Sequence, residues 1–362
     1  MKLRLLTSMF FCFLCSLLYS NNVDTLLVRN YENAFGELAS MLNGQQEPDF
    51  KKAVFITENA YFNDTLGYEK FNNQIQFLTY FVKTVLASDS LTYDGSDKES
   101  IAIQGAVFTV MTDTTYMKAD SMFFIHQPFT YDFEDIWGVN DWSKMFVTKL
   151  IRTGKGNCHA MPFLYKILCN ELGADAYLAL APHHIYIKCQ SKKWGWYNTE
   201  LTSGIFPVDS WLMASGYIHL SAIQNGIYMD TLSLKESIAF CMFDLAKDYE
   251  RKFGVGDGKF ILKCCNTALK YYPNFINALL LKAELLQKVI FQEVAKHKAK
   301  KPQDIFHIEG IKDQFTEMES TYIRIHQLGY RQMPEEMYMQ WISNLKTNKD
   351  LYQNNNILKF EN

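Results

Sequence analysis

Apolar residues recur every three or four positions through most of this chain. This spacing is present in residues 23–42 and 71–87. It predicts amphipathic helices, because positions three and four apart share one face of a helix. The same spacing in residues 145–156 and 158–172 predicts two more helices, separated by a glycine turn. Residues 21–90 are therefore expected to be mainly helical.

The pattern changes in the middle of the chain to short apolar runs at residues 176–181, 183–189 and 195–201. Runs of this length, separated by turn sequences such as SKKWG, predict antiparallel strands. A helix followed by several such strands is typical of an α+β module. Residues 101–113 predict a short helix or strand, and the aromatic stretch 123–143 predicts an irregular loop.

Helical spacing returns after residue 233. It predicts helices at 233–253, 259–273 and 274–297, and then a pair of helices at 304–329 and 334–346. Residues 268–286 resemble the hinge of a tetratricopeptide repeat, through the small residues Ala268, Ala278 and Ala283 and the turn residue Pro273. Arrays of this kind need about three units for stability. The region is therefore predicted to pack on the central module. Its helices are also predicted to offer a site for a protein partner.

The sequence divides into five segments. They are a signal peptide at 1–20, a mainly helical region at 21–125, an α+β core at 126–232, a tetratricopeptide-like helical region at 233–350, and a tail at 351–362 that is expected to be frayed. The first segment has Lys2 and Arg4 before an apolar run from Leu5 to Leu18, which is typical of secretory signal peptides. We expect a secreted or periplasmic protein cleaved after Ser20; an uncleaved membrane anchor is the alternative.

Charge and motifs exclude several classes of function. The formal net charge is −3, so nothing favours nucleic acid or an anionic membrane surface as a partner. The chain has no GxGxxG, no GxxxxGK[ST] and no CxxC motif. A metal site built from His159, His183 and His184 lacks the helical spacing of paired histidine ligands. We therefore expect no cofactor, no metal and no membrane contact beyond the signal segment.

Six cysteines follow the signal segment, without the spacing of a disulfide framework. Free cysteine is among the most buried residue types, so five of them are expected to be core thiols: Cys169, Cys189, Cys241, Cys264 and Cys265. Cys158 differs because it follows the sequence GKGN and begins a predicted helix. The helix dipole and the unpaired N–H groups of a first turn favour a thiolate.

A nucleophilic thiol needs a base and a group that orients the base. His184 stands at the start of a predicted strand, 26 residues after Cys158 (184 − 158). Glu200 follows on the next strand, and Asn198 shares its face there and is a rival orienting residue. His183 lies on the opposite strand face from His184, and His159 is turned about 100° from Cys158 on a helix. Both are expected to be structural.

Four motifs occur in order: Gly-x-Gly-x-Cys, Leu-Gly-x-x-Ala, His-x-Tyr and Trp-x-x-x-acid-x-Thr. They are carried by Gly154, Gly156, Cys158, Leu172, Gly173, Ala176, His184, Tyr186, Trp196, Glu200 and Thr202. Over roughly residues 130–210 this order resembles the transglutaminase-like superfamily, which has a papain-like fold and a Cys-His-Asp triad. The chain departs from that pattern by having Glu200 in place of the usual Asp.

The resemblance implies a papain/transglutaminase-like core between helical flanks. It also implies a cysteine-dependent hydrolase or acyltransferase, similar to cysteine proteases, that acts on protein or peptide substrates through a thioester. Cys158 would be the nucleophile, His184 the base and Glu200 or Asn198 the orienting residue, with the Cys158 N–H as an oxyanion donor. Two alternatives stay open: a catalytically degenerate module that binds peptides with its helical repeats, and a purely structural envelope protein.

Overall fold

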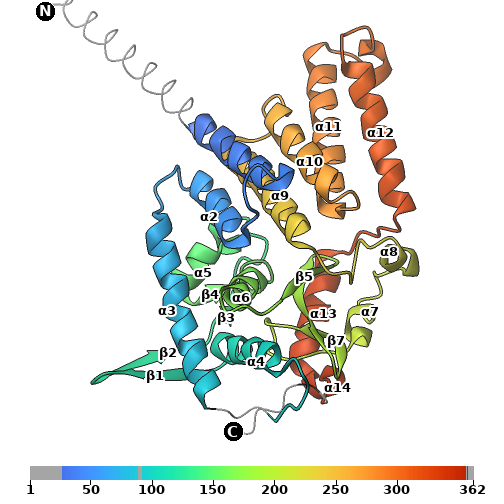
Figure 1. Ribbon diagram of the computed structural model, residues 1–362. Helices are drawn as coiled ribbons and strands as arrows, with labels where there is room; N and C mark the ends of the chain where they lie inside the picture. Colours follow the sequence, from blue (N-terminus) through green and yellow to red (C-terminus); the bar gives the residue numbers. More distant parts are fainter. Residues whose placement is uncertain (1–26, 89–91, 356, 358–362) are drawn as a thin grey trace, which may run out of the picture.

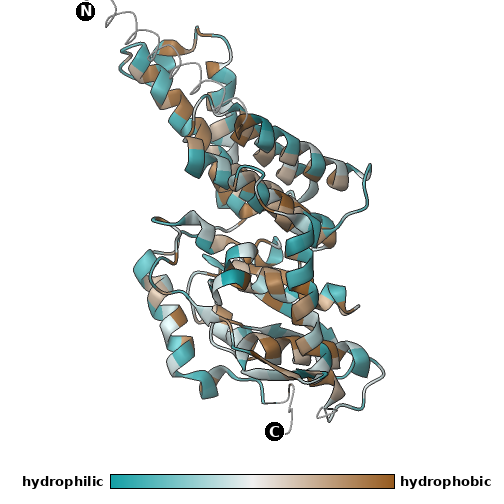
Figure 2. Cartoon of the chain, turned by 90° about the vertical axis from the view of Figure 1, so that its left-hand side faces the viewer, coloured by the Kyte–Doolittle hydropathy of each residue, from teal (hydrophilic) through white to brown (hydrophobic). Residues whose placement is uncertain are grey.

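The elements of this fold come from a computed structural model, which describes residues 27–88, 92–355 and 357. The fold is mixed α+β and mostly helical, with small sheets, as expected for the fold class. Figure 1 shows a core that holds the sheets, with helices α10–α12 extending away from it. Figure 2 shows hydrophilic and hydrophobic positions on different sides of the helices, as amphipathic helices require. The proposed signal segment lies outside the described residues.

The N-terminal region is helical, as predicted. Residues 27–43 are helical and are followed by α2 (Phe50–Tyr61), α3 (Tyr68–Ala87) and α4 (Lys98–Thr112). Helix α4 settles the choice between helix and strand for residues 101–113. Glu58 of α2 is buried and accepts hydrogen bonds from the amides of Val147 and Thr148. That contact joins the N-terminal helices to the core.

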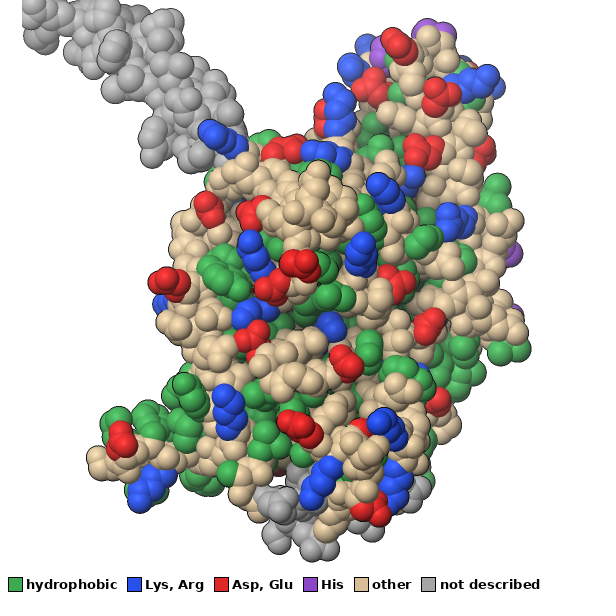
Figure 3. Space-filling view, viewed as in Figure 1, with side chains coloured by type: hydrophobic (Ala, Val, Ile, Leu, Met, Phe, Trp, Pro, Cys, Tyr) green, Lys and Arg blue, Asp and Glu red, His purple; other side chains and the backbone are tan. Residues whose placement is uncertain are grey.

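The prediction of an irregular loop from residue 123 was wrong at its start. Residues 115–126 form an antiparallel hairpin of β1 (Thr115–Ala119) and β2 (Met122–His126). One of its faces packs on α3 through Phe124 and His126. The other face leaves Tyr116, Phe123 and Ile125 exposed, so alternation of apolar and polar residues does not mark these strands. The hairpin protrudes with green apolar side chains in Figure 3.

The core combines one helix with a three-stranded antiparallel sheet, as predicted. The sheet order is β5 (Tyr177–Ala181), β6 (His184–Ser191) and β7 (Gly195–Thr199), and α6 (Ala160–Glu171) packs against it. Before α6 the chain forms β3 (Thr130–Tyr131), η1 (Trp142–Met145), α5 (Val147–Thr153) and β4 (Lys155–Gly156). Strands β3 and β4 pair in parallel and bring Tyr131 beside Gly156.

The helices after the sheet pack mainly on their neighbours in sequence. Short helices α7 (Asp209–Met213) and α8 (Leu220–Gln224) precede α9 (Leu234–Phe253), α10 (Lys259–Tyr271), α11 (Ile276–Lys296), η2 (Pro302–Ile305) and α12 (Ile311–Gln327). The predicted small residues Ala268, Ala278 and Ala283 are fully buried between these helices. Helix α9 also packs on α2, which ties the helical region to the rest of the fold.

The last helices do not follow the predicted pairing. Helix α12 packs on α11 and not on the helix that follows it. That helix, α13 (Glu335–Thr347), returns to the core and is followed by α14 (Lys349–Tyr352). Trp341 stacks on Trp211 with ring centroids 4.6 Å apart and donates from Nε1 to the Trp211 carbonyl. The described part of the tail is also held, because Gln353 bridges to Pro207. Burial of large aromatic rings explains why α13 favours the core over α12.

The cysteines fall into the two predicted groups, five buried thiols and the more exposed Cys158. Every cysteine of the described residues is a free thiol, and five are buried: Cys169, Cys189, Cys241, Cys264 and Cys265. Burial raises the pKa of each of these thiols, to about 12 for Cys189 and Cys265. Cys158 alone is only half-buried.

Candidate active site

Cys158 lies in a tight turn between α5 and α6, and each glycine before it has a local reason. Gly154 ends α5 with φ +69°, a left-handed conformation that favours glycine. Gly156 lies so close to Leu150 that a Cβ there would come within 2.8 Å of the Leu150 side chain. The two glycines therefore allow the chain to turn back sharply before the cysteine.

The prediction that the helix begins at Cys158 was wrong by two residues. Helix α6 begins at Ala160 with His159 at the N-cap position, and Asn157 accepts hydrogen bonds from the first amides. The Asn157 side chain accepts hydrogen bonds from the amides of His159 (3.0 Å) and Ala160 (3.2 Å), and its carbonyl accepts from Met161 (3.1 Å). Because Asn157 takes these donors, Cys158 is held in the turn just before the helix, and its own amide takes no part in the capping.

His184 and Glu200 meet as the sequence order suggested. His184 opens β6, and Glu200 lies one residue beyond the end of β7. The His184 Nε2 atom lies 2.6 Å from Glu200 Oε2, and both side chains are almost fully buried. Glu200 Oε1 accepts the amide of Thr202 at 2.7 Å, which holds the carboxylate in place. The carboxylate thus holds the proton on Nε2 and leaves Nδ1 for the cysteine side.

Asn198 does not take part in this contact. Its side-chain nitrogen donates to the carbonyl of Pro207 (3.0 Å) and to Asp209 Oδ1 (2.8 Å). Asn198 and Glu200 share a strand face, but Asn198 lies opposite Lys188 in the register, further along β6 from His184. Of the two rival orienting residues, the structure therefore brings only Glu200 to His184.

The surroundings of Cys158 favour the thiolate. Burial raises the pKa of its thiol, but the hydrogen bond and charge of His184 and a hydrogen bond from Tyr338 outweigh burial, so the pKa is lowered. Burial lowers the pKa of His184, but the charge of Glu200 and the contacts with Cys158 raise it to about 10. These opposite shifts favour a thiolate on Cys158 and a protonated ring on His184.

Tyr338 is a site residue that the sequence analysis missed. Its hydroxyl donates to Cys158 Sγ at 3.4 Å and lies 3.2 Å from His184 Nδ1. A second hydroxyl, that of Tyr131, lies 3.4 Å from the hydroxyl of Tyr338. Tyr338 comes from α13, 154 residues after His184. No local pattern could have marked it, because PEEMYMQW is an ordinary amphipathic stretch.

Replacing Tyr338 by phenylalanine should disfavour the Cys158 thiolate while leaving the cysteine in place. A hydrogen bond to a charged group is worth about 1.5–3 kcal/mol. We therefore expect alkylation of Cys158 by iodoacetamide near pH 6 to slow by about tenfold. The control is Tyr186→Phe, since the buried Tyr186 hydroxyl has no partner among the described residues. Equal alkylation rates in Tyr338→Phe and wild type would exclude this role for the hydroxyl.

The other two candidate histidines, His159 and His183, have structural contacts. His159 Nδ1 contacts the Met145 carbonyl (2.9 Å) and Nε2 contacts Asp244 (3.1 Å), so His159 faces away from Cys158. His183 occupies the β5–β6 turn with φ +57°, and its Nε2 lies 2.9 Å from the Met333 carbonyl. Its own carbonyl can accept a hydrogen bond from the Cys158 thiol at 3.7 Å.

The described residues show neither a metal cluster nor a membrane-spanning helix. Within the ranges given above, no group of three or more His, Cys, Asp or Glu side chains is arranged to hold a metal ion. In the same ranges, no helix has both the length and the apolar character needed to cross a bilayer.

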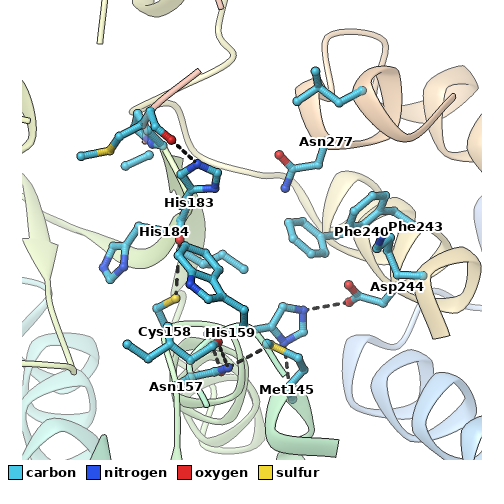
Figure 4. Close-up of a pocket in the computed structure, with 18 of the residues that line it drawn as sticks. Met145, Asn157, Cys158, His159, His183, His184, Phe240, Phe243, Asp244 and Asn277 are labelled. Atoms are coloured by element: carbon cyan, nitrogen blue, oxygen red, sulfur yellow. Dashed lines mark hydrogen bonds and ion pairs between the residues drawn. The ribbon is translucent and has the colours of Figure 1, made fainter. Parts of the chain in front are cut away.

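A cleft of about 460 Å³ opens in front of Cys158. Figure 4 shows its two walls: Cys158, His183 and His184 on one side, and Phe240, Asp244 and Asn277 on the other. The first wall belongs to the core, and the second belongs to helices α9 and α11. Cys158 is therefore accessible from a space that the helical region helps to form.

Comparisons with known proteins give little. No family model matches the chain, and no curated protein matches it. A crystal structure of menin, described as revealing the binding site for Mixed Lineage Leukemia (MLL) protein, is similar with a TM-score of 0.29 and 14% identity, over 89% of this chain and 92% of that chain. A likeness this weak supports neither a fold family nor a function.

Proposed function

We propose that this protein is a transglutaminase-like, cysteine-dependent acyl-transfer enzyme whose core has the papain-like arrangement. The observation that carries the proposal is a connected set of contacts: the Tyr338 hydroxyl lies 3.4 Å from Cys158 Sγ and 3.2 Å from His184 Nδ1, and His184 is in turn held by Glu200 at 2.6 Å. Nucleophile, base and orienting carboxylate are the three parts that thiol catalysis needs.

In the proposed reaction the Cys158 thiolate attacks the carbonyl carbon of a peptide or carboxamide. A C–S bond forms, the C–N bond breaks, and His184 gives its Nδ1 proton to the leaving amine. Water then attacks the thioester carbonyl and passes a proton to His184. The C–S bond breaks, the acid is released, and the starting thiolate–imidazolium pair is restored. An amine in place of water would give transamidation. We favour hydrolysis, as in bacterial members of the superfamily that the sequence resembles.

Two groups can stabilise the oxyanion that forms on the substrate. The Cys158 amide is free of the capping contacts of Asn157, and the Tyr338 hydroxyl lies 3.4 Å from Sγ. Donors aimed at the developing charge are a large source of rate enhancement. Tyr338 thus adds a second donor to the amide that the sequence suggested.

The rival proposal, a degenerate binding scaffold, is motivated by glutamate in place of aspartate and by oxyanion donors that the sequence does not identify. Glu200 has one methylene more than aspartate, but its carboxylate still lies 2.6 Å from Nε2 of His184. The substitution therefore gives no argument against catalysis.

We also propose export, on the strength of residues 1–20 alone.

The proposal is tested by formation of a thioester on Cys158. Incubation of the full chain with an activated acyl donor, such as p-nitrophenyl acetate, should add one acetyl group to Cys158, and hydroxylamine should remove it. Intact-mass spectrometry and peptide mapping measure both steps. Acetylation of Cys158→Ala to the same extent as the wild type would contradict the proposal.

A further inference from the structure

The cleft wall opposite Cys158 is built from one face of α9. Phe240, Phe243, Asp244, Lys247 and Arg251 all line the cleft. Each of them lies three or four residues from another member of the set, which places them in a stripe along one side of the helix. The stripe changes from aromatic to charged along its length, so the two parts of the cleft differ in chemistry.

The aromatic part of the cleft fits an apolar side chain. Phe240 and Phe243 of α9 and Leu280 of α11 line one wall, and Trp137 of the core lines the other. Asn277 points its amide toward the cleft (Figure 4). An amide in this place can donate to and accept from a peptide backbone. Apolar walls with a few polar groups are typical of sites that bind ligands.

The charged part of the cleft has an excess of positive groups, because Lys247, Arg251 and Arg331 line it together with Asp244 and Glu335. Glu250 is shared by Lys247 (2.6 Å) and Lys288 (2.9 Å), so one carboxylate faces two ammonium groups. Arg251 lies over the Trp142 ring, 4.9 Å from its centroid, and forms no salt bridge with any residue that the structure describes. Asp244 is already paired with His159 at 3.1 Å. Lys247 and Arg251 therefore leave positive charge for a ligand.

We propose that the cleft binds an extended polypeptide segment with a large apolar side chain near the reacting carbonyl and an acidic side chain toward Lys247 and Arg251. The cleft volume of about 460 Å³ suits a short peptide stretch and not a folded domain. Reaction of the bound segment rests on the proposed function, whereas binding does not require chemistry at Cys158.

The experiment measures peptide binding to the full chain with Cys158→Ala, so that no peptide is consumed. The probes are fluorescein-labelled peptides of about seven residues that contain Phe and Gln, flanked on both sides by Asp. Matched peptides have Lys in place of Asp, or Ser in place of Phe. Fluorescence anisotropy should give at least about tenfold tighter binding for the Phe/Asp peptide than for either matched peptide.

Charge reversal locates the site. Arg251→Glu should weaken binding of the Phe/Asp peptide by about tenfold and strengthen binding of the Lys peptide. Arg152→Glu is the matched control, because Arg152 is exposed on α5 and does not line the cleft, yet it changes the net charge equally.

The outcomes are distinct. Absence of binding, equal affinity for the Asp and Lys peptides, or equal effects of Arg251→Glu and Arg152→Glu would each overturn the cleft proposal. Selective binding by a protein whose Cys158 forms no thioester would overturn the proposed function and leave the cleft proposal standing.

Discussion

Replacing Cys158 by alanine should abolish rapid alkylation of the native protein by iodoacetamide at about pH 6, which is more than two units below the usual thiol pKa of about 8.5. Only the thiolate reacts, and the alkylation rate of an ordinary thiol falls about tenfold per pH unit below its pKa. Cys158 has a lowered pKa, whereas the five buried cysteines have raised ones. Labelling of the wild type should therefore occur at Cys158 and persist as the pH falls.

Peptide mapping after labelling measures this directly. The same substitution should reduce any acyl-transfer activity by about 10³-fold or more, since loss of a nucleophile leaves only binding and oxyanion contacts. Cys169→Ala is the control, because Cys169 is a fully buried thiol of the adjacent helix α6. If wild type and Cys158→Ala are labelled equally, Cys158 is not the nucleophile.

Replacing Glu200 by glutamine should lower the acyl-transfer rate constant by about 10²–10⁴-fold while leaving Cys158 in place. The Glu200 carboxylate accepts a hydrogen bond from the protonated Nε2 of His184 at 2.6 Å. The glutamine amide can instead turn its NH₂ group toward the ring and favour the other tautomer of His184. Loss of the negative charge also destabilises the imidazolium. The pKa of His184, about 10 in the native protein, must therefore fall.

The pH profile of activity shows in which direction Glu200→Gln shifts the pKa of His184. The thiolate–imidazolium pair exists between the lowered pKa of Cys158 and the raised pKa of His184, so activity should decline as the pH rises through about 10. In Glu200→Gln that decline should occur at lower pH. Asn198→Ala should affect stability through its contacts with Pro207 and Asp209, but not the pH profile. A larger loss of activity in Asn198→Ala than in Glu200→Gln would reverse the assignment.

The fold was predictable where structure is local. Helical spacing identified α3, α6 and α9, and short apolar runs identified the three strands of the central sheet. These patterns work because burial of one face imposes a period on the sequence. The hairpin β1–β2 escaped prediction because its outer face is apolar and exposed.

The sequence alone determined the candidate chemistry: a cysteine after a glycine turn, a histidine at the start of a strand, and Glu200 or Asn198 on the next strand. It could not choose between the last two, because they share a strand face and only sheet register sets the distance of each from His184. It could not find Tyr338, which reaches Cys158 only because α13 buries Trp341 against Trp211. Contacts between residues far apart in the chain leave no period in the sequence, so only the tertiary structure decided them.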